Sequence, residues 1–443
     1  MTLLIEKKPE AAAGFRPLRP EFRRGFAPLA GAAVLLTLLV ALAEPAASWQ
    51  GGWAETRDRT HAAAVLLGIP LALAAGCWQG GRERRCRTGD LLRTSVRGAL
   101  PRFLASAVPV ALWVAVGHLV AAGCALLATW YCATGDSPYL VVPLTDTLLL
   151  FAAALGGQAV GRVVPWRLTA PVLATCGYVV LGFLSYDHRN TYAGLSPLID
   201  TSVTKLTVWW QPWVSVLWVG GLAATAVLAL TTRRRAVALV PLALATAAAI
   251  TLVEADELTR PNPVARRQVC DTSTTPQVCV NKRYEELLPQ ITEALSGLTG
   301  RLEGVDNLPV RFEDRAGRSR PDKARLPMVT PLGRSVVRGK LTDPELYAWE
   351  AGMSLVGRGE CDTTDDAVAR TDRAVEHYLA PSPMEKYFDD LAAKGTEADR
   401  AKLKARQQAR ARLLGMAQDE RREWLSEYFA TADVCDPSGV PTL

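Results

Sequence analysis

The chain has 443 residues and a mass of 47.8 kDa, with 49% hydrophobic and 21% charged residues. These averages conceal two different halves. Residues 1–253 carry 22 Lys and Arg against 12 Asp and Glu, whereas residues 254–443 carry 28 against 32. The positive charges of the first half stand between apolar runs too long for a soluble core, which disfavours nucleic-acid binding as their role. A single soluble globule, a collagenous chain and a disordered chain are excluded.

Seven apolar stretches in the first half are long enough, or nearly so, to cross a bilayer. An 18-residue helix rises roughly 27 Å, close to the hydrocarbon thickness of about 30 Å. Every backbone polar group in lipid needs an internal partner, so we predict that all seven are helices. They run approximately over Phe26–Ala43, Ala62–Trp78, Phe103–Trp130, Leu140–Val164, Leu168–Leu184, Trp213–Leu230 and Ala236–Val253.

The basic residues between these stretches predict the orientation. If the N-terminus lies inside, the inside segments carry 18 Lys and Arg and the outside segments carry four. The inside set is Lys7, Lys8, Arg16, Arg19, Arg23, Arg24, Arg82, Arg84, Arg85, Arg87, Arg93, Arg97, Arg102, Arg162, Arg167, Arg233, Arg234 and Arg235, and the outside set is Arg57, Arg59, Arg189 and Lys205. The positive-inside rule therefore predicts a cytoplasmic N-terminus in the cell membrane and an extracytoplasmic domain over residues 254–443.

Few polar groups lie within the predicted spans. His118 falls in the middle of the third span and Asp146 in the outer part of the fourth. Such groups line a substrate path or stabilise helix packing, and the sequence favours neither role. No chain of acids for a proton pump is visible, so proton-coupled transport is disfavoured. The glycine-rich stretch 156–161 in the fourth span is more consistent with close helix contact than with a phosphate-binding loop.

The nine cysteines divide between the two halves. Four lie in the second half, at Cys270, Cys279, Cys361 and Cys435. An even number on an external domain is typical of disulfides rather than free thiols. Of the three possible connectivities we favour Cys270–Cys279 and Cys361–Cys435, the first of which closes a short ring worth roughly 2–3 kcal/mol. A zinc site is less favoured, because the spacing is too wide and no histidine lies nearby.

The second half begins with an expected stalk over residues 254–281, which includes the cysteine loop. An apolar stripe from Tyr284 to Leu302 at spacings of three and four then predicts a helix, which Pro289 kinks or begins. Two short extended pieces follow, around Leu308–Phe312 and Arg325–Thr330.

The remainder of the second half is predicted to be helical. Asp343 with Pro344 is a helix N-cap, and Ser382 with Glu385 is a capping box. The apolar residues between Trp424 and Phe429 form one face of the last helix. The charged runs 362–372 and 400–412 are interpreted as solvated helix faces. The sequence therefore predicts an α-helical polytopic membrane domain, residues 1–253, followed by a mostly helical α+β domain.

Motifs for catalysis are missing from the sequence. It has no H-E-x-x-H cluster, no G-x-S-x-G elbow and no G-x-x-x-x-G-K-[ST] loop. We therefore predict no catalytic residue, metal or cofactor, and no ATP site on this chain.

The cytoplasmic loop between the second and third spans is the most informative segment. A plain positive-inside anchor needs only arginine, yet this loop also has Glu83, placed to pair with Arg87 at i,i+4. The residues from Thr88 onward predict the start of a helix, which carries the apolar pair Leu91 and Leu92. The residues that we assign to it as a functional set are Arg82, Glu83, Arg84, Arg85, Arg87, Asp90, Leu91 and Leu92.

This loop resembles that of actinobacterial permease subunits of type-two ABC exporters, which reads roughly G-R-E-R-R-x-G-T-x-E-L-L. The match runs from Gly81 to Leu92, with Gly89 after rather than before Thr88 and with Asp90 where Glu is common. The resemblance covers roughly residues 15–235. The cysteine loop and the following Tyr284, Leu287, Leu288 and Pro289 are similar to the external domain of actinobacterial permease-like membrane proteins.

The resemblance implies a transport function. The loop would hold a coupling helix that docks on a separate ABC ATP-binding subunit, and two permeases would pair as a homodimer or heterodimer in the lipid bilayer. An alternative is a membrane-anchored extracytoplasmic binding or sensor protein without transport activity, which explains the loop only as an anchor. An integral membrane enzyme is a third possibility, for which no constellation of catalytic residues is visible.

Overall fold

The computed structural model describes residues 22, 25–86, 98–133, 137–164, 166–186, 192–199, 201, 205–255, 257–264, 267–314, 323–329, 335–358, 365–432 and 439–443. The chain forms two compact units. The membrane unit comprises Met1–Trp49, Trp53–Tyr131 and Pro138–Asn262, and the C-terminal unit comprises Gln50–Gly52, Cys132–Ser137 and Pro263–Leu443.

Seven helical segments in the described part of the membrane unit are long and apolar enough to span a membrane, as predicted. Five are single helices: α2 (Phe26–Ala43), α7 (Ala99–Trp130), α8 (Val141–Val163), α9 (Thr169–Tyr186) and α10 (Gln211–Thr231). The second span consists of α3 (Trp53–Ala63), the π-helical η2 (Ala64–Gly68) and α4 (Ile69–Gly80), and the seventh of η4 (Arg235–Ala238) and α11 (Leu239–Glu254). Three short helices lie between spans in the described residues: η1 (Ala46–Ser48), α5 (Arg82–Arg85) and η3 (Ala193–Leu195).

The second span differs from its predicted bounds. Its helix begins at Trp53 rather than at Ala62, and its 28 residues rise roughly 42 Å, more than a hydrocarbon core of about 30 Å. The early turns contain Glu55, Arg57 and Thr60, which are buried by neighbouring protein rather than by lipid. Hydropathy does not detect such a segment, because its polar side chains are covered by the bundle.

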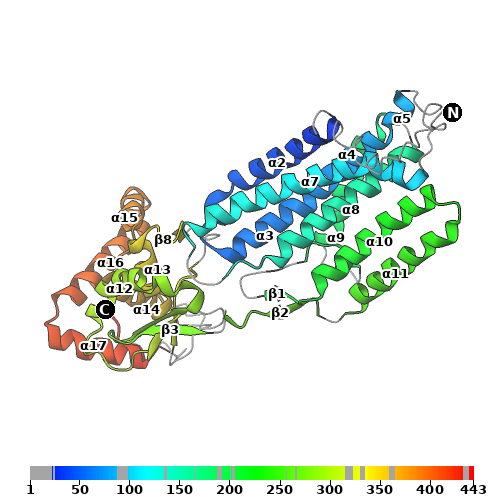
Figure 1. Cartoon of the computed structure of the whole chain (residues 1–443). Coiled ribbons are helices and arrows are strands. Elements are labelled where there is room, and N and C mark those ends of the chain that lie inside the picture. Colours follow the sequence, from blue (N-terminus) through cyan, green and yellow to red (C-terminus); the bar gives the residue numbers. More distant parts are fainter. Residues whose placement is uncertain are drawn as a thin grey trace, which may run out of the picture. The chain divides into compact units, whose positions relative to one another are not determined.

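The spans of the membrane unit pack side by side (Figure 1). The second span packs against α8 and α9, α2 packs along α7, and α10 packs between α8 and α11. Strands β1 (Lys205–Thr207) and β2 (Thr259–Pro261) pair in antiparallel register and link the segments before α10 and after α11. They lie at the end of the bundle opposite α5 (Figure 1).

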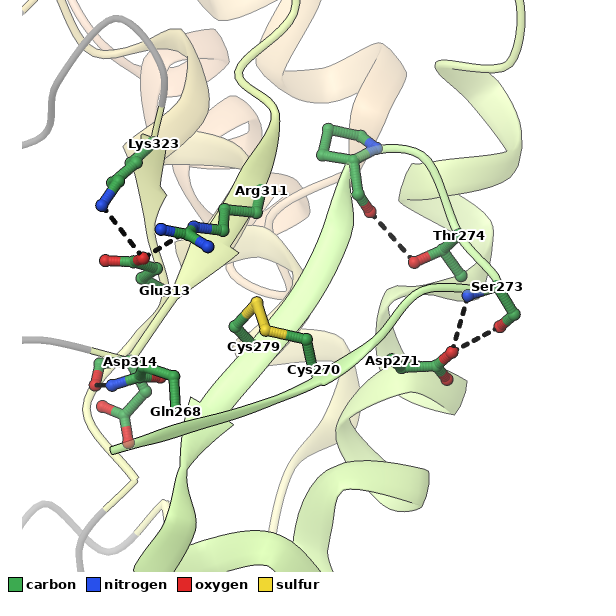
Figure 2. Close-up of a disulfide and its surroundings, with 11 residues drawn as sticks. Gln268, Cys270, Asp271, Ser273, Thr274, Cys279, Arg311, Glu313, Asp314 and Lys323 are labelled. Atoms are coloured by element: carbon green, nitrogen blue, oxygen red, sulfur yellow. Dashed lines mark hydrogen bonds and ion pairs between the residues drawn. A yellow bond between two sulfur atoms is a disulfide. The ribbon is translucent and has the colours of Figure 1, made fainter. Parts of the chain in front are cut away.

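A four-stranded sheet opens the C-terminal unit. It contains β3 (Gln268–Asp271), β4 (Gln277–Asn281), β5 (Arg311–Glu313) and β6 (Lys323–Arg325), in that order; β3 is antiparallel to β4 and the other neighbours are parallel. Cys270 faces Cys279 across the first pair, and the predicted disulfide between them is confirmed (Figure 2). Cys361 and Cys435 lie outside the described residues.

The expected stalk is therefore wrong in its second half. Residues 268–281 form two strands of this sheet, and Val278, Cys279 and Val280 are fully buried in the unit. The segment is therefore part of the folded unit rather than a free connection, because β4 pairs with β3 on one side and with β5 on the other and a disulfide joins β3 to β4.

Helices cover the sheet and form the rest of the unit. They are η6 (Lys282–Leu287), α12 (Leu288–Arg301), α13 (Pro344–Val356), α14 (Asp366–Leu379), α15 (Glu385–Lys394), α16 (Glu397–Gly415) and α17 (Gln418–Ala430), with the hairpin β7 (Val336–Val337) and β8 (Lys340–Leu341) before α13. The apolar stripe is confirmed, because Ile291, Leu295 and Leu298 of α12 are buried in the core. Pro289 stands in the first turn of α12 and begins it.

Of the two predicted caps, one is confirmed. The Asp343 carboxylate accepts a hydrogen bond from the Leu346 amide at 2.9 Å, with Pro344 as the first residue of α13. The predicted capping box between Ser382 and Glu385 is wrong. The Glu385 carboxylate instead lies 2.7 Å from His377 Nδ1 and forms an ion pair with Arg410. A capping box does join Thr396 and Asp399 at the start of α16.

Candidate functional site

The loop between the second and third spans begins with the cationic helix α5. The Arg85 guanidinium turns back onto α4, where it donates to the Trp78 carbonyl oxygen and lies 4.3 Å from the centre of the Trp78 ring. Arg82 and Arg84 are exposed. Arg85 thus fastens α5 to the end of the second span, and Arg84 faces solvent. Arg87, Asp90, Leu91 and Leu92 and the side chain of Glu83 lie outside the described residues.

Glycines bring the second span and α8 into close backbone contact at the α5 end of the two helices. A methyl group on Gly76 or Gly80 would overlap backbone atoms of α8, and one on Gly157 or Gly161 would overlap backbone carbonyls of α4. The order of these contacts along both helices shows that the two spans are parallel. The glycine stretch of the fourth span therefore serves close helix contact, as predicted from the sequence. The second span and α8 form one closely packed pair.

A buried polar cluster lies at the other end of this helix pair. His61 Nδ1 of α3 lies 2.8 Å from Asp146 Oδ1 in the second turn of α8, and His61 Nε2 lies 3.1 Å from the carbonyl oxygen of Pro197. Asp146 is only 1% exposed. The His61 imidazole of the second span thus contacts both a carboxylate of α8 and a carbonyl of the segment that follows α9.

The π-helical turn η2 follows His61 by three residues. Pro70 explains it, because Pro70 has no N–H for the carbonyl of Leu66 and its ring would collide with that carbonyl in a regular α-helix. The wider turn η2 accommodates Pro70 and shifts the helix face before it relative to the face after it. The face with His61 and the face with the glycines can thereby both point toward α8.

A small cavity adjoins the pair. Its volume is about 20 Å³, enough for one water molecule, and it is enclosed by α3, α8, α10 and the segment around Pro197. Asp58 Oδ1 at its side accepts from Thr201 Oγ1 at 2.7 Å and from Arg57 Nε at 2.9 Å. Gln211 and Ser215 of α10 also line the cavity, and Gln211 Nε2 donates to Ser215 Oγ at 2.9 Å. The cavity therefore combines charged and neutral polar groups within the bundle.

The two polar residues predicted from the sequence have different surroundings. Asp146 belongs to the cluster described above. His118 is equally buried, and its Nε2 lies 3.3 Å from the Pro143 carbonyl oxygen, while its Nδ1 has no hydrogen-bond partner among the described residues. The sequence missed His61, because it precedes the predicted second span. The helix of the second span begins before the apolar stretch and includes His61, and an extension of the predicted helix toward Trp53 would have revealed this residue.

The C-terminal unit contains an open groove between α14, α15 and α16, of about 960 Å³. Arg406 and Arg410 of α16 pair with Asp389 of α15 at 3.3 and 3.0 Å, so this part of the run 400–412 is not a solvated face. Phe388 and Leu391 of α15 line the groove and are more than half exposed. Ion pairs thus hold α15 beside α16 with its apolar side chains uncovered.

Comparison of the chain with known proteins and structures finds no match. The chain matches no protein family, no curated protein and no solved structure. The functional argument therefore depends on the residues and on their geometry.

Proposed function

We propose that this chain is the membrane-spanning permease subunit of an ABC transporter, whose ATP is hydrolysed by a separate subunit. The observation that carries the proposal is the exposed cationic helix α5, fastened by Arg85 to a span that is itself closely packed on α8. A docking helix that transmits a movement into the bundle needs such a stiff connection. Arg84 supplies a charge for the docking surface.

The charge distribution supports a cytoplasmic position for α5. The loops at its end of the bundle carry Arg82, Arg84, Arg85, Arg167, Arg233, Arg234 and Arg235 among the described residues. By the positive-inside rule this end is cytoplasmic, and the C-terminal unit, after an odd number of spans, is extracytoplasmic.

A second copy or a related permease completes the transporter in this proposal. Helix α9 supports it with an exposed apolar surface: only Ala170 is buried, and Val179, Val180 and Phe183 are more than half exposed. Lipid or a second bundle covers such a surface in a membrane.

Purification from the native cells tests the proposal. The full chain carries a C-terminal tag and is compared with Arg84→Glu and with the matched variant Arg234→Glu, an exposed arginine at the same end of the bundle. Loss of a charge-assisted contact costs roughly 1.5–3 kcal/mol, or about 10–100-fold in affinity. We expect a stoichiometric P-loop ATPase with the wild type and with Arg234→Glu, and its loss with Arg84→Glu. No ATPase with the wild type, or equal amounts with both variants, would contradict the proposal.

The groove of the C-terminal unit favours one second candidate, a membrane-anchored binding protein without transport activity. Its apolar side chains Phe388 and Leu391 and its volume suit a ligand or a peptide. The same purification separates the two functions. A co-purified extracytoplasmic partner that is lost with Phe388→Asp, without any ATPase, would favour the binding protein.

A further inference from the structure

The His61 imidazole lies between two hydrogen-bond acceptors. A carbonyl oxygen has no proton to donate, so His61 Nε2 must carry the hydrogen that faces Pro197. The contact of 2.8 Å between Nδ1 and Asp146 Oδ1 then contains one further proton, on the nitrogen or on the carboxyl. In either arrangement the pair is neutral overall and shares a single proton.

Burial makes this neutral state the stable one. The side chains of His61 and Asp146 are 13% and 1% exposed. Release of the proton to solvent leaves one negative charge on the pair, and a buried unpaired charge is destabilising by several kcal/mol. The lone pair of a deprotonated Nδ1 would also face the carboxylate, which pushes the two side chains apart.

Among the residues that the structure describes, three other charged or titratable groups face the pair from the elements packed around it. Arg57 and Asp58 belong to α3, and His118 belongs to α7. Asp58 is already paired with Arg57 and bonded to Thr201. Helix α10 presents Gln211 and Ser215, which do not titrate. Within the described part of the chain, the hydrogen bonds of His61 thus reach Asp146 and Pro197, and no second carboxylate is placed to take over the proton.

The same imidazole holds the segment 192–199, which we call the cap. Besides the Pro197 contact, the cap is joined to the bundle by Ser196 Oγ, which lies 2.8 Å from Ser185 Oγ of α9. Within the cap, the amides of Leu195 and Ser196 donate to the carbonyls of Tyr192 and Ala193. Separation of His61 from Asp146 would turn the ring away from Pro197 and release the cap.

We propose that His61 and Asp146 form a proton-binding site, and that the bound proton holds the cap and the second span against α8. The ligand is a single proton exchanged with solvent at the β1–β2 end of the bundle. The inference does not depend on the transport proposal. Because the second span continues into α5, the proton also fixes the span that carries the cationic loop helix.

Hydrogen–deuterium exchange on the full chain in lipid nanodiscs tests the proposal. Exchange of the cap amides is measured between about pH 6 and pH 9 and corrected for the intrinsic rate. We expect protection in the wild type to fall at least tenfold as the pH rises, because loss of the proton releases the cap. A wild type with constant protection would overturn the proposal.

The variant Asp146→Asn sharpens this test. An asparagine amide can donate to Nδ1 while Nε2–H still donates to Pro197, so the contacts persist without the shared proton. We expect protection that no longer depends on pH. The control His118→Gln keeps the pair and should retain the wild-type response. The same pH response in Asp146→Asn as in the wild type would overturn the proposal.

A second measurement applies to the wild type alone. The chain has only four histidines, so ¹⁵N-histidine labelling gives few signals, and ¹³C-aspartate labelling reports the carboxyl. We expect at neutral pH one proton on either His61 Nδ1 or the Asp146 carboxyl. An unprotonated Nδ1 beside an ionised Asp146 would overturn the proposal.

Discussion

The two compact units of this chain bury different kinds of residue. Where the second span meets α8, glycines bring the two backbones into contact and several alanines are buried, whereas large apolar side chains such as those of α9 point outward. The core of the C-terminal unit contains Tyr428, Phe312 and the leucines of α12. Lipid is as apolar as leucine, so burial of large side chains does not drive helices together in a membrane, and close backbone contact takes its place. In water, the large side chains themselves drive the folding.

The largest effect should come from the polar cluster that interrupts the core of the C-terminal unit. Arg358, 7% exposed, pairs with Asp372 at 3.2 Å, and Tyr428 Oη donates to the same carboxylate at 2.6 Å. Asp372→Ala leaves the buried guanidinium without its anion, and we expect a loss of about 4 kcal/mol in unfolding free energy. Hydrogen exchange of α14 and α17 in the full chain measures it. The exposed Asp366 of α14 is the matched control, and Asp366→Ala should cost under about 1 kcal/mol; equal losses would contradict the account.

A single methyl group tests the close helix contact of the membrane unit. In Gly157→Ala the new Cβ overlaps the backbone of Leu73, which cannot rotate away. We expect a loss of about 3 kcal/mol and a lower thermal midpoint in nanodiscs. Its neighbour provides the control, since a Cβ on Gly156 meets its nearest heavy atom only at 3.7 Å, on Ala223. Gly156→Ala should be nearly neutral, and similar behaviour of the two variants would show that the glycines are not packed as described.

The disulfide is a stabilising element of the C-terminal unit alone. Replacing Cys270 and Cys279 together by serine opens a loop with a sequence separation of nine residues. We expect the unit to lose roughly 2.5 kcal/mol, and the membrane unit to keep its thermal midpoint. Hydrogen exchange resolves the two units in one experiment. Increased exchange of the amides in β3 and β4 without any change in α4 and α8 is the expected pattern, and no change in the strands would contradict it.

The smallest effect should be a pH dependence at the end of β5. Burial raises the pKa of Asp314 to about 6 from 3.8, against the opposing backbone hydrogen bond from Asn281 and the charges of Arg283 and Arg325. The folded state therefore binds this proton more tightly, and its contribution to stability is complete below about pH 4 and lost as the pH rises through 6. We expect this proton to contribute roughly 2 kcal/mol to the free energy of unfolding, a value that already allows for screening by solvent. Asp314→Asn should abolish the dependence, whereas the exposed Asp306→Asn should preserve it.

The sequence predicted the spans well because lipid imposes length and apolarity on each of them. Six spans both begin and end within a few residues of prediction. The exception is the second, whose early turns carry Glu55, Arg57 and His61. Protein rather than lipid covers these residues, and no local pattern reports that.

The site was only half predictable for the same reason. Asp146 was visible as an acid within a span, but its partner His61 is 85 residues away and depends on the parallel register of two spans. The sequence does hold a partial indication of that register, because glycines at a spacing of four occur on both spans and lie where the two helices touch. The Glu385 cap failed because a distant arginine, Arg410, and the nearer His377 engage the carboxylate.

Site-specific photo-crosslinking tests the central claim of a docking helix most directly. A photoreactive residue replaces Arg84 on α5 in the native cells, and another replaces the exposed Trp209 near the β1–β2 end of the bundle. The crosslinked proteins are identified by mass spectrometry. The account predicts a P-loop ATPase crosslinked at position 84 and none at position 209. Position 84 crosslinked to lipid alone, or to no ATPase, would contradict the account.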